Sequence, residues 1–150
     1  MMDQMLPDGI KKIPDHVFHY IENELQLYRA YKQALAELEA DLEDLVNRSA
    51  QLPFDEIHVR NGPTDIINLT VIRSLVLEEK IKEKLSRVRK IETGLKIMSE
   101  EEKSILDLKY FSGIDYTNDQ IIVTLNLNRN RYYKLRDGII YKFSIIFGLV

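Results

Sequence analysis

Residues 114–143 read IDYTNDQIIVTLNLNRNRYYKLRDGIIYKF, a stretch that predicts two helices separated by a tight turn. Thr117 is a good N-cap for a short helix over residues 118–125, because its hydroxyl accepts a hydrogen bond from a free backbone N–H. Asn126 and Leu127 form the predicted turn, and Asn128 caps a longer helix. The apolar residues of this longer helix recur at steps of three and four, which predicts one buried face: Tyr132, Leu135, Ile139 and Phe143.

The opposite face of the longer helix is polar and basic. A short helix, a tight turn with an aliphatic residue and a longer helix that starts with basic residues are typical of a helix-turn-helix, whose second helix enters the major groove of DNA. Arginine bridges two acceptors on guanine, asparagine pairs with adenine, and lysine and tyrosine reach phosphates. The candidate DNA-binding residues are therefore Thr117, Asn128, Arg129, Asn130, Arg131, Tyr133, Lys134 and Arg136. The alternative is that this basic face is only the solvated side of a structural bundle.

A further helix is predicted directly before this stretch. Residues 99–102 read SEEE, a capping box in which Ser99 accepts a hydrogen bond from the backbone and Glu102 reaches back to the Ser99 N–H. The helix begins near Glu100 and ends at Gly113. We divide the chain at Met98/Ser99, with a compact helical module over 99–150.

The N-terminal part of the chain predicts two long helices. Apolar residues at steps of three and four run along residues 14–48, with one irregular pair of steps, and again along residues 65–98. Pro53, Asn61-Gly62 and Pro63 place a loop between them, and Thr64 or Asp65 can cap the second helix. Its predicted seam is Ile67, Val71, Leu77, Ile81, Leu85, Val88, Ile91 and Leu95.

The predicted fold class is all-α. A tail over residues 1–13 precedes a long, coiled-coil-like helical hairpin over residues 14–98, and a helix-turn-helix domain follows over residues 99–150. A long helix cannot bury its apolar seam alone, so the two long helices are expected to pair antiparallel, within one chain or between two. We interpret the hairpin as an oligomerisation module.

Charge is unevenly distributed along the 150 residues, although the net charge is only −3. Residues 14–48 hold eight acids against three bases, whereas residues 129–142 hold five bases against one acid. The basic end suits phosphate, and the acidic end opposes indiscriminate binding to DNA. The chain has no cysteine, which excludes a disulfide framework and suits the cytoplasm. No membrane partner is expected, because the apolar stretch at residues 143–150 is far shorter than the roughly 20 residues of a spanning helix.

The segment from Met98 to Phe143 resembles the ArpU/RinA-type regulators of phages and prophages of Gram-positive bacteria, which are similar to region four of bacterial sigma factors. The resemblance is carried by MSEEEKSILDLKYF, by YTNDQIIVTLNLNRNRYYKL and by the paired tyrosines Tyr132-Tyr133 before a basic residue. It covers about a third of the chain, and the long helical N-terminal half agrees in layout. The resemblance implies control of late phage genes, such as packaging or lysis genes, in a bacterial host cell.

An enzyme is not expected. The sequence has no Gly-rich phosphate loop, no nucleophile elbow and no metal cluster, and the capping role explains the carboxylates of residues 100–102. His16 and His19 lie three residues apart on a predicted helix but lack an evident third ligand, and His58 is a lone loop histidine. We predict no catalytic residue, no metal and no cofactor.

The expected partners are double-stranded DNA, further copies of the chain as a homodimer or higher oligomer, and RNA polymerase, for which the acidic first helix is the candidate surface. A dimer would read two half-sites about one helical turn apart. Two alternatives stay open: a small terminase subunit-like DNA-packaging adaptor, which assembles rings, and a helical interaction protein that does not bind DNA. The tail at residues 144–150 is expected to pack on the helix-turn-helix or on a second subunit.

Overall fold

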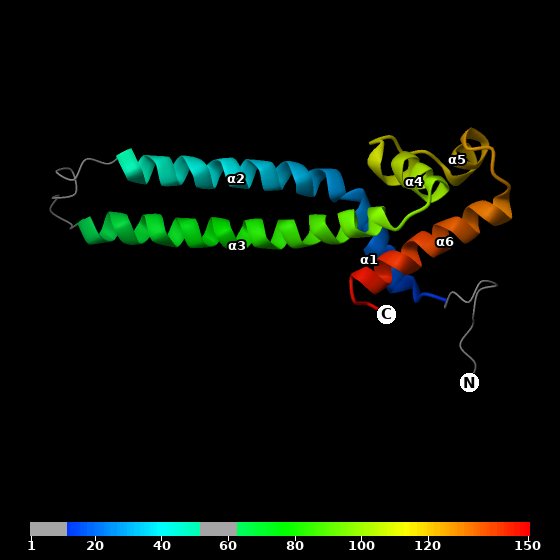
Figure 1. Ribbon diagram of the computed structural model, residues 1–150, viewed down its shortest axis with the longest axis horizontal. Helices are drawn as coiled ribbons and strands as arrows, with labels where there is room; N and C mark the ends of the chain where they lie inside the picture. Colours follow the sequence, from blue (N-terminus) through cyan, green and yellow to red (C-terminus); the bar gives the residue numbers. More distant parts are fainter. Residues whose placement is uncertain (1–11, 52–62) are drawn as a thin grey trace. The chain divides into compact units, whose positions relative to one another are not determined.

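The computed structural model describes residues 12–51 and 63–150, which are entirely helical apart from turns and loops. The elements follow the order α1 (Asp15–Gln26), α2 (Tyr28–Gln51), α3 (Pro63–Lys96), α4 (Glu100–Leu106), the π-helical turn η2 (Asp107–Phe111), α5 (Asn118–Thr124) and α6 (Arg129–Ile146) (Figure 1). The predicted all-α class is confirmed. The predicted N-terminal tail up to residue 11, and the loop with Pro53, His58 and Asn61-Gly62, lie outside the described residues.

The chain forms two units. One, here the hairpin unit, is Ala30–Ser86; the other, here the compact unit, combines Met1–Arg29, as far as it is described, with Arg87–Val150. This division differs from the predicted one at Met98/Ser99, because α1 packs on η2 and α6. The last turns of α3 also belong to the compact unit. The predicted C-terminal module therefore shares its core with residues from the other end of the chain.

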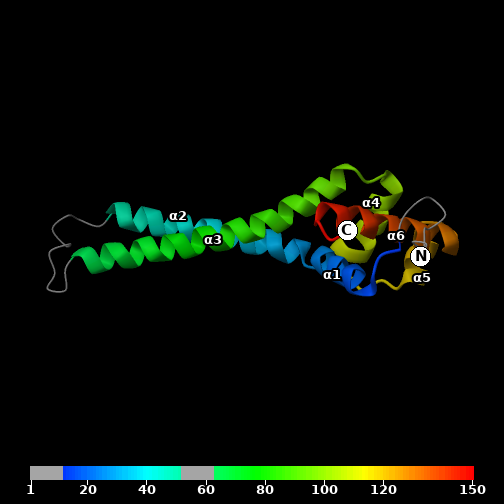
Figure 2. The ribbon, with the colours of Figure 1, turned by 90° about the horizontal axis from the view of Figure 1, so that it is seen from below.

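The hairpin unit consists of α2 and α3, which run antiparallel and side by side (Figures 1 and 2). Its facing side chains are half-buried, and the Lys84 ammonium lies 5.3 Å from the centre of the Tyr31 ring. One position of the predicted seam is wrong. Val71 is 50% exposed, and Thr70 and Ser74 lie half-buried in its place. The expected cap is also wrong, because α3 begins at Pro63 and includes Thr64 and Asp65 in its first turn.

The predicted first helix, residues 14–48, is interrupted at Leu27. Leu27 has φ −87° and ψ −3° and separates α1 from α2, so the single rod expected from the sequence is wrong. The interruption coincides with the irregular part of the apolar pattern, where Leu25, Tyr28 and Tyr31 follow one another at two successive steps of three. Such steps overwind a helical seam relative to the regular alternation of three and four.

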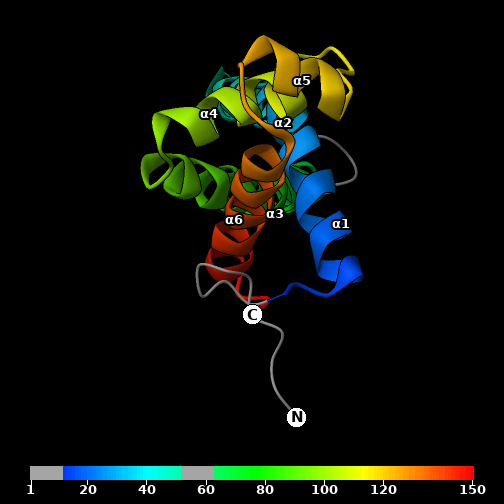
Figure 3. The same ribbon diagram turned by 90° about the vertical axis from the view of Figure 1, so that its right-hand side faces the viewer.

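The core of the compact unit contains side chains from five helices. α6 lies against α1 and α4 (Figure 3). The aliphatic and aromatic side chains that are least accessible are Ile21 and Leu25 of α1, Ile91 of α3, Ile105 and Leu106 of α4, Ile121 of α5, and Tyr132, Ile139, Ile140 and Phe143 of α6. Gly94 lets α3 and α6 approach closely, since a Cβ at this position would lie 2.1 Å from Cε1 of the Phe143 ring.

Two buried carboxylates in this unit are paired with bases. Glu24 of α1 forms an ion pair with Arg87 of α3. Glu102 of α4 accepts hydrogen bonds from the Lys142 ammonium at 2.8 and 3.0 Å. Pairing with a base offsets the loss of hydration that a buried carboxylate suffers. Each of the two pairs joins helices that are distant in sequence.

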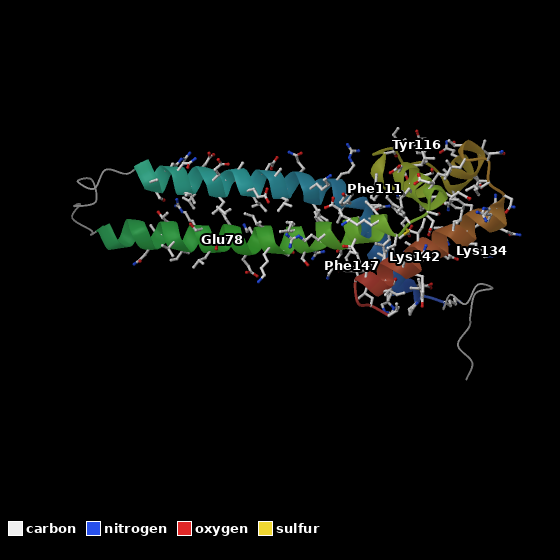
Figure 4. The ribbon with its side chains drawn as sticks, viewed as in Figure 1. Glu78, Phe111, Tyr116, Lys134, Lys142 and Phe147 are labelled. Carbon is white, nitrogen blue, oxygen red and sulfur yellow. The ribbon has the colours of Figure 1, made fainter. Side chains whose placement is uncertain are left out.

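The apolar tail continues α6 rather than forming a separate segment. α6 extends to Ile146, and Gly148 ends it with φ +74°, while the Leu149 N–H donates to the Ser144 carbonyl at 2.9 Å. The Phe147 ring meets the Tyr20 ring edge-on at 6.4 Å between centres, and the Lys90 ammonium lies 5.4 Å from its centre. The tail therefore packs on α1 and α3 through Phe147, near the C-terminal end of α6 (Figure 4).

Candidate nucleic-acid interface

The predicted capping box before α4 is confirmed. The Glu102 N–H donates to the Ser99 hydroxyl at 3.2 Å, and the Ser99 N–H donates to the Glu102 carboxylate at 3.0 Å. After α4 the helix widens into η2, which the sequence does not predict. Within η2 the Tyr110 hydroxyl donates to the Glu22 carboxylate of α1 at 2.7 Å. Burial and the neighbouring Glu22 charge raise the pKa of Tyr110, so this hydroxyl stays a donor.

The short helix α5 begins as predicted at Thr117. The Gln120 N–H donates to the Thr117 hydroxyl at 3.2 Å, and the Gln120 side-chain carbonyl accepts from the Thr117 N–H at 2.9 Å. This is a second complete capping box. Gly113, with φ +76°, ends the preceding helix as expected. The start of α5 is therefore fixed by local backbone hydrogen bonds.

The turn between α5 and α6 depends on Asn126. Asn126 has φ +54°, in the left-handed region that asparagine tolerates better than most residues. The Leu127 N–H donates to the Ile122 carbonyl at 3.0 Å, and the Asn126 N–H donates to the Val123 carbonyl at 3.2 Å, which closes the end of α5. Leu127 is half-buried, in line with the aliphatic turn residue that the sequence predicts.

α6 begins at Arg129 with Asn128 as its N-cap, as predicted. The Asn128 side-chain oxygen accepts a hydrogen bond from the Arg131 N–H at 2.7 Å. This bond satisfies one of the backbone donors that the first turn of any helix leaves free. Asn128 therefore orders the turn that carries the candidate base-reading residues.

Removing the Asn128 cap should destabilise the first turn of α6. We expect Asn128→Ala to lower the free energy of unfolding by about 1 kcal/mol, the usual effect of losing an N-cap. Asn128→Ser keeps a side-chain acceptor and should stay within about 0.5 kcal/mol of wild type. Urea denaturation followed by circular dichroism measures both variants, and equal destabilisation of the two would contradict the capping role.

The Asn118 side chain joins three elements of the site. Its carbonyl oxygen accepts from the Tyr132 hydroxyl of α6 at 2.6 Å and from the Lys109 ammonium of η2 at 2.8 Å. Burial raises the pKa of Tyr132 to about 12 and lowers the pKa of Lys109. Asn118 therefore fixes α5 against both η2 and α6. Sequence reasoning missed this residue, because its two partners lie 9 and 14 positions away.

The first two turns of α6 expose four of the eight predicted DNA-binding residues: Arg129, Asn130, Arg131 and Lys134. Lys134 lies near the N-terminal end of the helix (Figure 4). Tyr133 is half-buried, and its ring meets the buried Tyr132 ring edge-on at 5.1 Å. The exposed surface at the start of α6 is thus polar and positively charged.

Both arginines at this surface are held by acids of neighbouring helices. The Arg129 guanidinium lies 2.7 Å from the Asp119 carboxylate of α5. The Arg131 guanidinium donates two hydrogen bonds to the Glu101 carboxylate of α4, at 2.9 and 2.7 Å. These bonds lower the pKa of Glu101 and raise the pKa of Arg131. The sequence did not predict either pair.

Arg136 differs from the other predicted residues. It is half-buried, with its guanidinium carbon 4.9 Å from the centre of the Phe18 ring and 4.8 Å from that of Tyr133. It also donates to the Asp137 carboxylate at 2.9 Å. A guanidinium stacked on two rings is held in place by cation–π attraction. This arrangement favours a positioning role, in which Arg136 fixes α6 against α1.

No group of three histidine, cysteine, aspartate or glutamate side chains is placed to hold a metal ion within residues 12–51 and 63–150. His16 and His19 are exposed, with the His19 ring nitrogen 3.9 Å from the Glu22 carboxylate. Among the described helices, none is both long and apolar enough to cross a membrane.

The eight predicted residues fall into three groups. Thr117 and Asn128 cap helices, Tyr133 and Arg136 pack partly inside, and the other four are exposed at the start of α6. The arrangement can present hydrogen-bond donors and positive charge to a nucleic acid. No protein-family model, curated protein or solved structure matches this chain.

Proposed function

We propose that this protein is a sequence-specific DNA-binding transcriptional regulator of phage or prophage late genes, which reads double-stranded DNA through α6. The observation that carries the proposal is the exposed, polar and basic start of α6, placed directly after the Asn128 cap. The assignment to late phage genes follows from the resemblance of residues 98–143 alone. A helix with capped, ordered donors at its N-terminal end suits the major groove.

Each exposed residue has a distinct part in the proposed recognition. Arg129 and Arg131 would donate bidentate hydrogen bonds to guanine or contact phosphates, and Asn130 would pair with adenine. Lys134, about one turn further along α6, would contact the phosphate backbone. Arg136 and Asn118 would act indirectly by holding α6 at a fixed angle.

The two ion pairs would have to exchange when DNA binds. Arg129 would leave Asp119, and Arg131 would leave Glu101, for acceptors on the DNA. Both pairs are exposed to solvent, and such pairs contribute little to stability, so their exchange is feasible. The two carboxylates also repel phosphate, which would weaken binding wherever the arginines do not find matching bases.

The test is DNA binding over a salt series with fragments of the genome in which the gene lies. We expect one fragment to bind selectively, with an affinity that falls steeply as salt rises. Arg129→Ala/Arg131→Ala should lose this preference and bind at least about tenfold more weakly, since each specific arginine contact contributes about 1–3 kcal/mol.

The matched control is Lys80→Ala/Lys82→Ala, which removes two exposed positive charges from α3 in the hairpin unit. It should keep the selective fragment, so a loss equal to that of the arginine variant would contradict the role of α6. Absence of binding above background at low salt would contradict the proposal as a whole and favour a helical interaction protein that does not bind DNA.

A further inference from the structure

The hairpin unit lacks a buried core of its own. None of the described side chains of Ala30–Ser86 is buried, although the compact unit buries residues from each of its helices. Figure 4 shows the side chains with which α2 and α3 face each other. When only two helices pair, one side of their apolar seam stays exposed to water. Helical folds normally cover that side with further helices. The hairpin therefore has an apolar surface that a single chain leaves uncovered.

This surface is concentrated on the first described turns of α3. Five apolar side chains there are 48–58% exposed: Leu69, Val71, Ile72, Leu75 and Val76. The half-buried positions between them are the polar Thr70 and Ser74. The apolar residues of this segment are thus about half exposed to solvent, whereas a two-helix hairpin that is stable alone would bury its apolar residues between the helices. Further along α3, residues 78–84 carry six charges in seven positions, which ends the apolar surface.

A groove next to this surface combines apolar residues with both signs of charge. It has a volume of about 430 Å³ and lies between α2 and α3. Leu45, Ile72, Val76 and Leu77 form its apolar lining, and its charged residues are Asp41, Asp44, Arg48 and Arg73. Two acids and two bases therefore share one small patch.

We propose that this face, the α3 surface at residues 69–76 with the adjoining groove, binds the same face of a second copy of the chain. In a two-fold symmetric dimer one patch meets itself, so each acid must find its base within that patch. The groove meets this condition, since Asp41 and Asp44 of one chain can pair with Arg48 and Arg73 of the other. The α2 and α3 helices of the two chains would then form a four-helix bundle that encloses the apolar side chains.

A lipid bilayer fits this surface less well. Asp41 and Asp44 line the groove beside the apolar side chains. Carboxylates are costly to place in hydrocarbon and are repelled by anionic lipid headgroups. A partner with an apolar stripe and charges of both signs matches the patch better, and a second copy supplies both.

The first test is the mass of the full chain in solution without DNA, measured by light scattering and sedimentation at about 1–100 µM. We expect a species of twice 17.6 kDa. Ile72→Glu should give monomers and raise the dissociation constant about 100-fold or more, because a charge would enter an apolar interface twice. The matched control is Ile114→Glu in the compact unit, because Ile114 and Ile72 are both 56% exposed. It should remain dimeric.

The second test exchanges charges and separates a lost interface from a lost fold. Asp41→Lys/Asp44→Lys makes the four charges of the groove all positive, and Arg48→Glu/Arg73→Glu makes them all negative. Each variant alone should be monomeric with an unchanged helical circular dichroism spectrum, and an equimolar mixture should form a heterodimer.

Three results would overturn the proposal: a monomeric wild type over the whole range, a dimeric Ile72→Glu chain, or a mixture of charge variants that stays monomeric. A monomeric wild type that also binds phosphatidylcholine vesicles would assign the face to a membrane instead. None of these measurements involves DNA, so their outcome is independent of the proposed DNA binding.

Discussion

Gly94→Ala should lower the free energy of unfolding by about 2 kcal/mol. The added Cβ would lie 2.1 Å from Cε1 of Phe143, a ring that is completely buried between α3 and α6. Overpacking a dense core costs about 1–3 kcal/mol and occasionally more, and so close a contact belongs at the upper end. Alanine gains about 1 kcal/mol of helix propensity over glycine, which offsets only part of this cost. Urea denaturation followed by circular dichroism gives the difference.

The control for Gly94→Ala is a change at Phe143, the residue that the added Cβ would contact. Phe143→Leu alone should destabilise the compact unit by leaving a cavity, but it also makes room for the Cβ at residue 94. The double variant Gly94→Ala/Phe143→Leu should therefore be more stable than the sum of the two single effects predicts. If the two single effects simply add, the chain accommodates the added Cβ by a shift that does not involve the Phe143 ring. A Gly94→Ala chain as stable as wild type would contradict the close approach itself.

Asn118→Ala should destabilise the protein by about 3 kcal/mol. It removes the only acceptor that the described residues show for the buried Tyr132 hydroxyl, and the acceptor of the half-buried Lys109 ammonium. A buried donor left without an acceptor costs about 1–3 kcal/mol, and more when it is charged. Chemical denaturation measures the loss of stability.

The matched control is Asn118→Asp, which keeps an oxygen for both donors and adds an ion pair with Lys109. It should remain within about 1 kcal/mol of wild type, since acids also suit the first turn of α5. Tyr132→Phe in the Asn118→Ala background should recover part of the loss, because one of the two orphaned donors is then gone. Equal destabilisation by alanine and aspartate would argue against the hydrogen bonds and for a packing role of Asn118.

The helix boundaries near the candidate site were predictable because their causes are local. Ser99 with Glu102 and Asn128 with the Arg131 N–H act within one turn of the chain, so the sequence shows both partners together. Gly113 and Asn126 likewise mark the ends of helices through their own backbone conformation. The exposed start of α6 follows from the same local pattern of apolar and basic residues.

The features that the sequence did not reveal depend on tertiary contacts. The pairing of Arg131 with Glu101 spans 30 positions, and that of Arg129 with Asp119 spans 10, so no periodicity relates them. The π-helical turn after Leu106 and the close approach at Gly94 likewise depend on packing between helices. The interruption at Leu27 did leave a trace, the two successive steps of three, but that trace alone does not distinguish a break from a curved helix.

The division of the compact unit between the two ends of the chain has a consequence for the order of synthesis. The hydrogen bond from Tyr110 to Glu22 spans 88 residues, and α6 from the far end of the chain covers α1 from the near end. Such distant contacts are slow to form, because the intervening loop must close first. The hairpin unit is complete once residue 86 has been synthesised, long before the residues of α6 have been added. When α2 and α3 pair, they bring Tyr31 and Lys84 into contact and shorten the loop that the compact unit has to close. Early pairing of α2 and α3 would thus speed the contact between α1 and α6, which can form only at the end of synthesis.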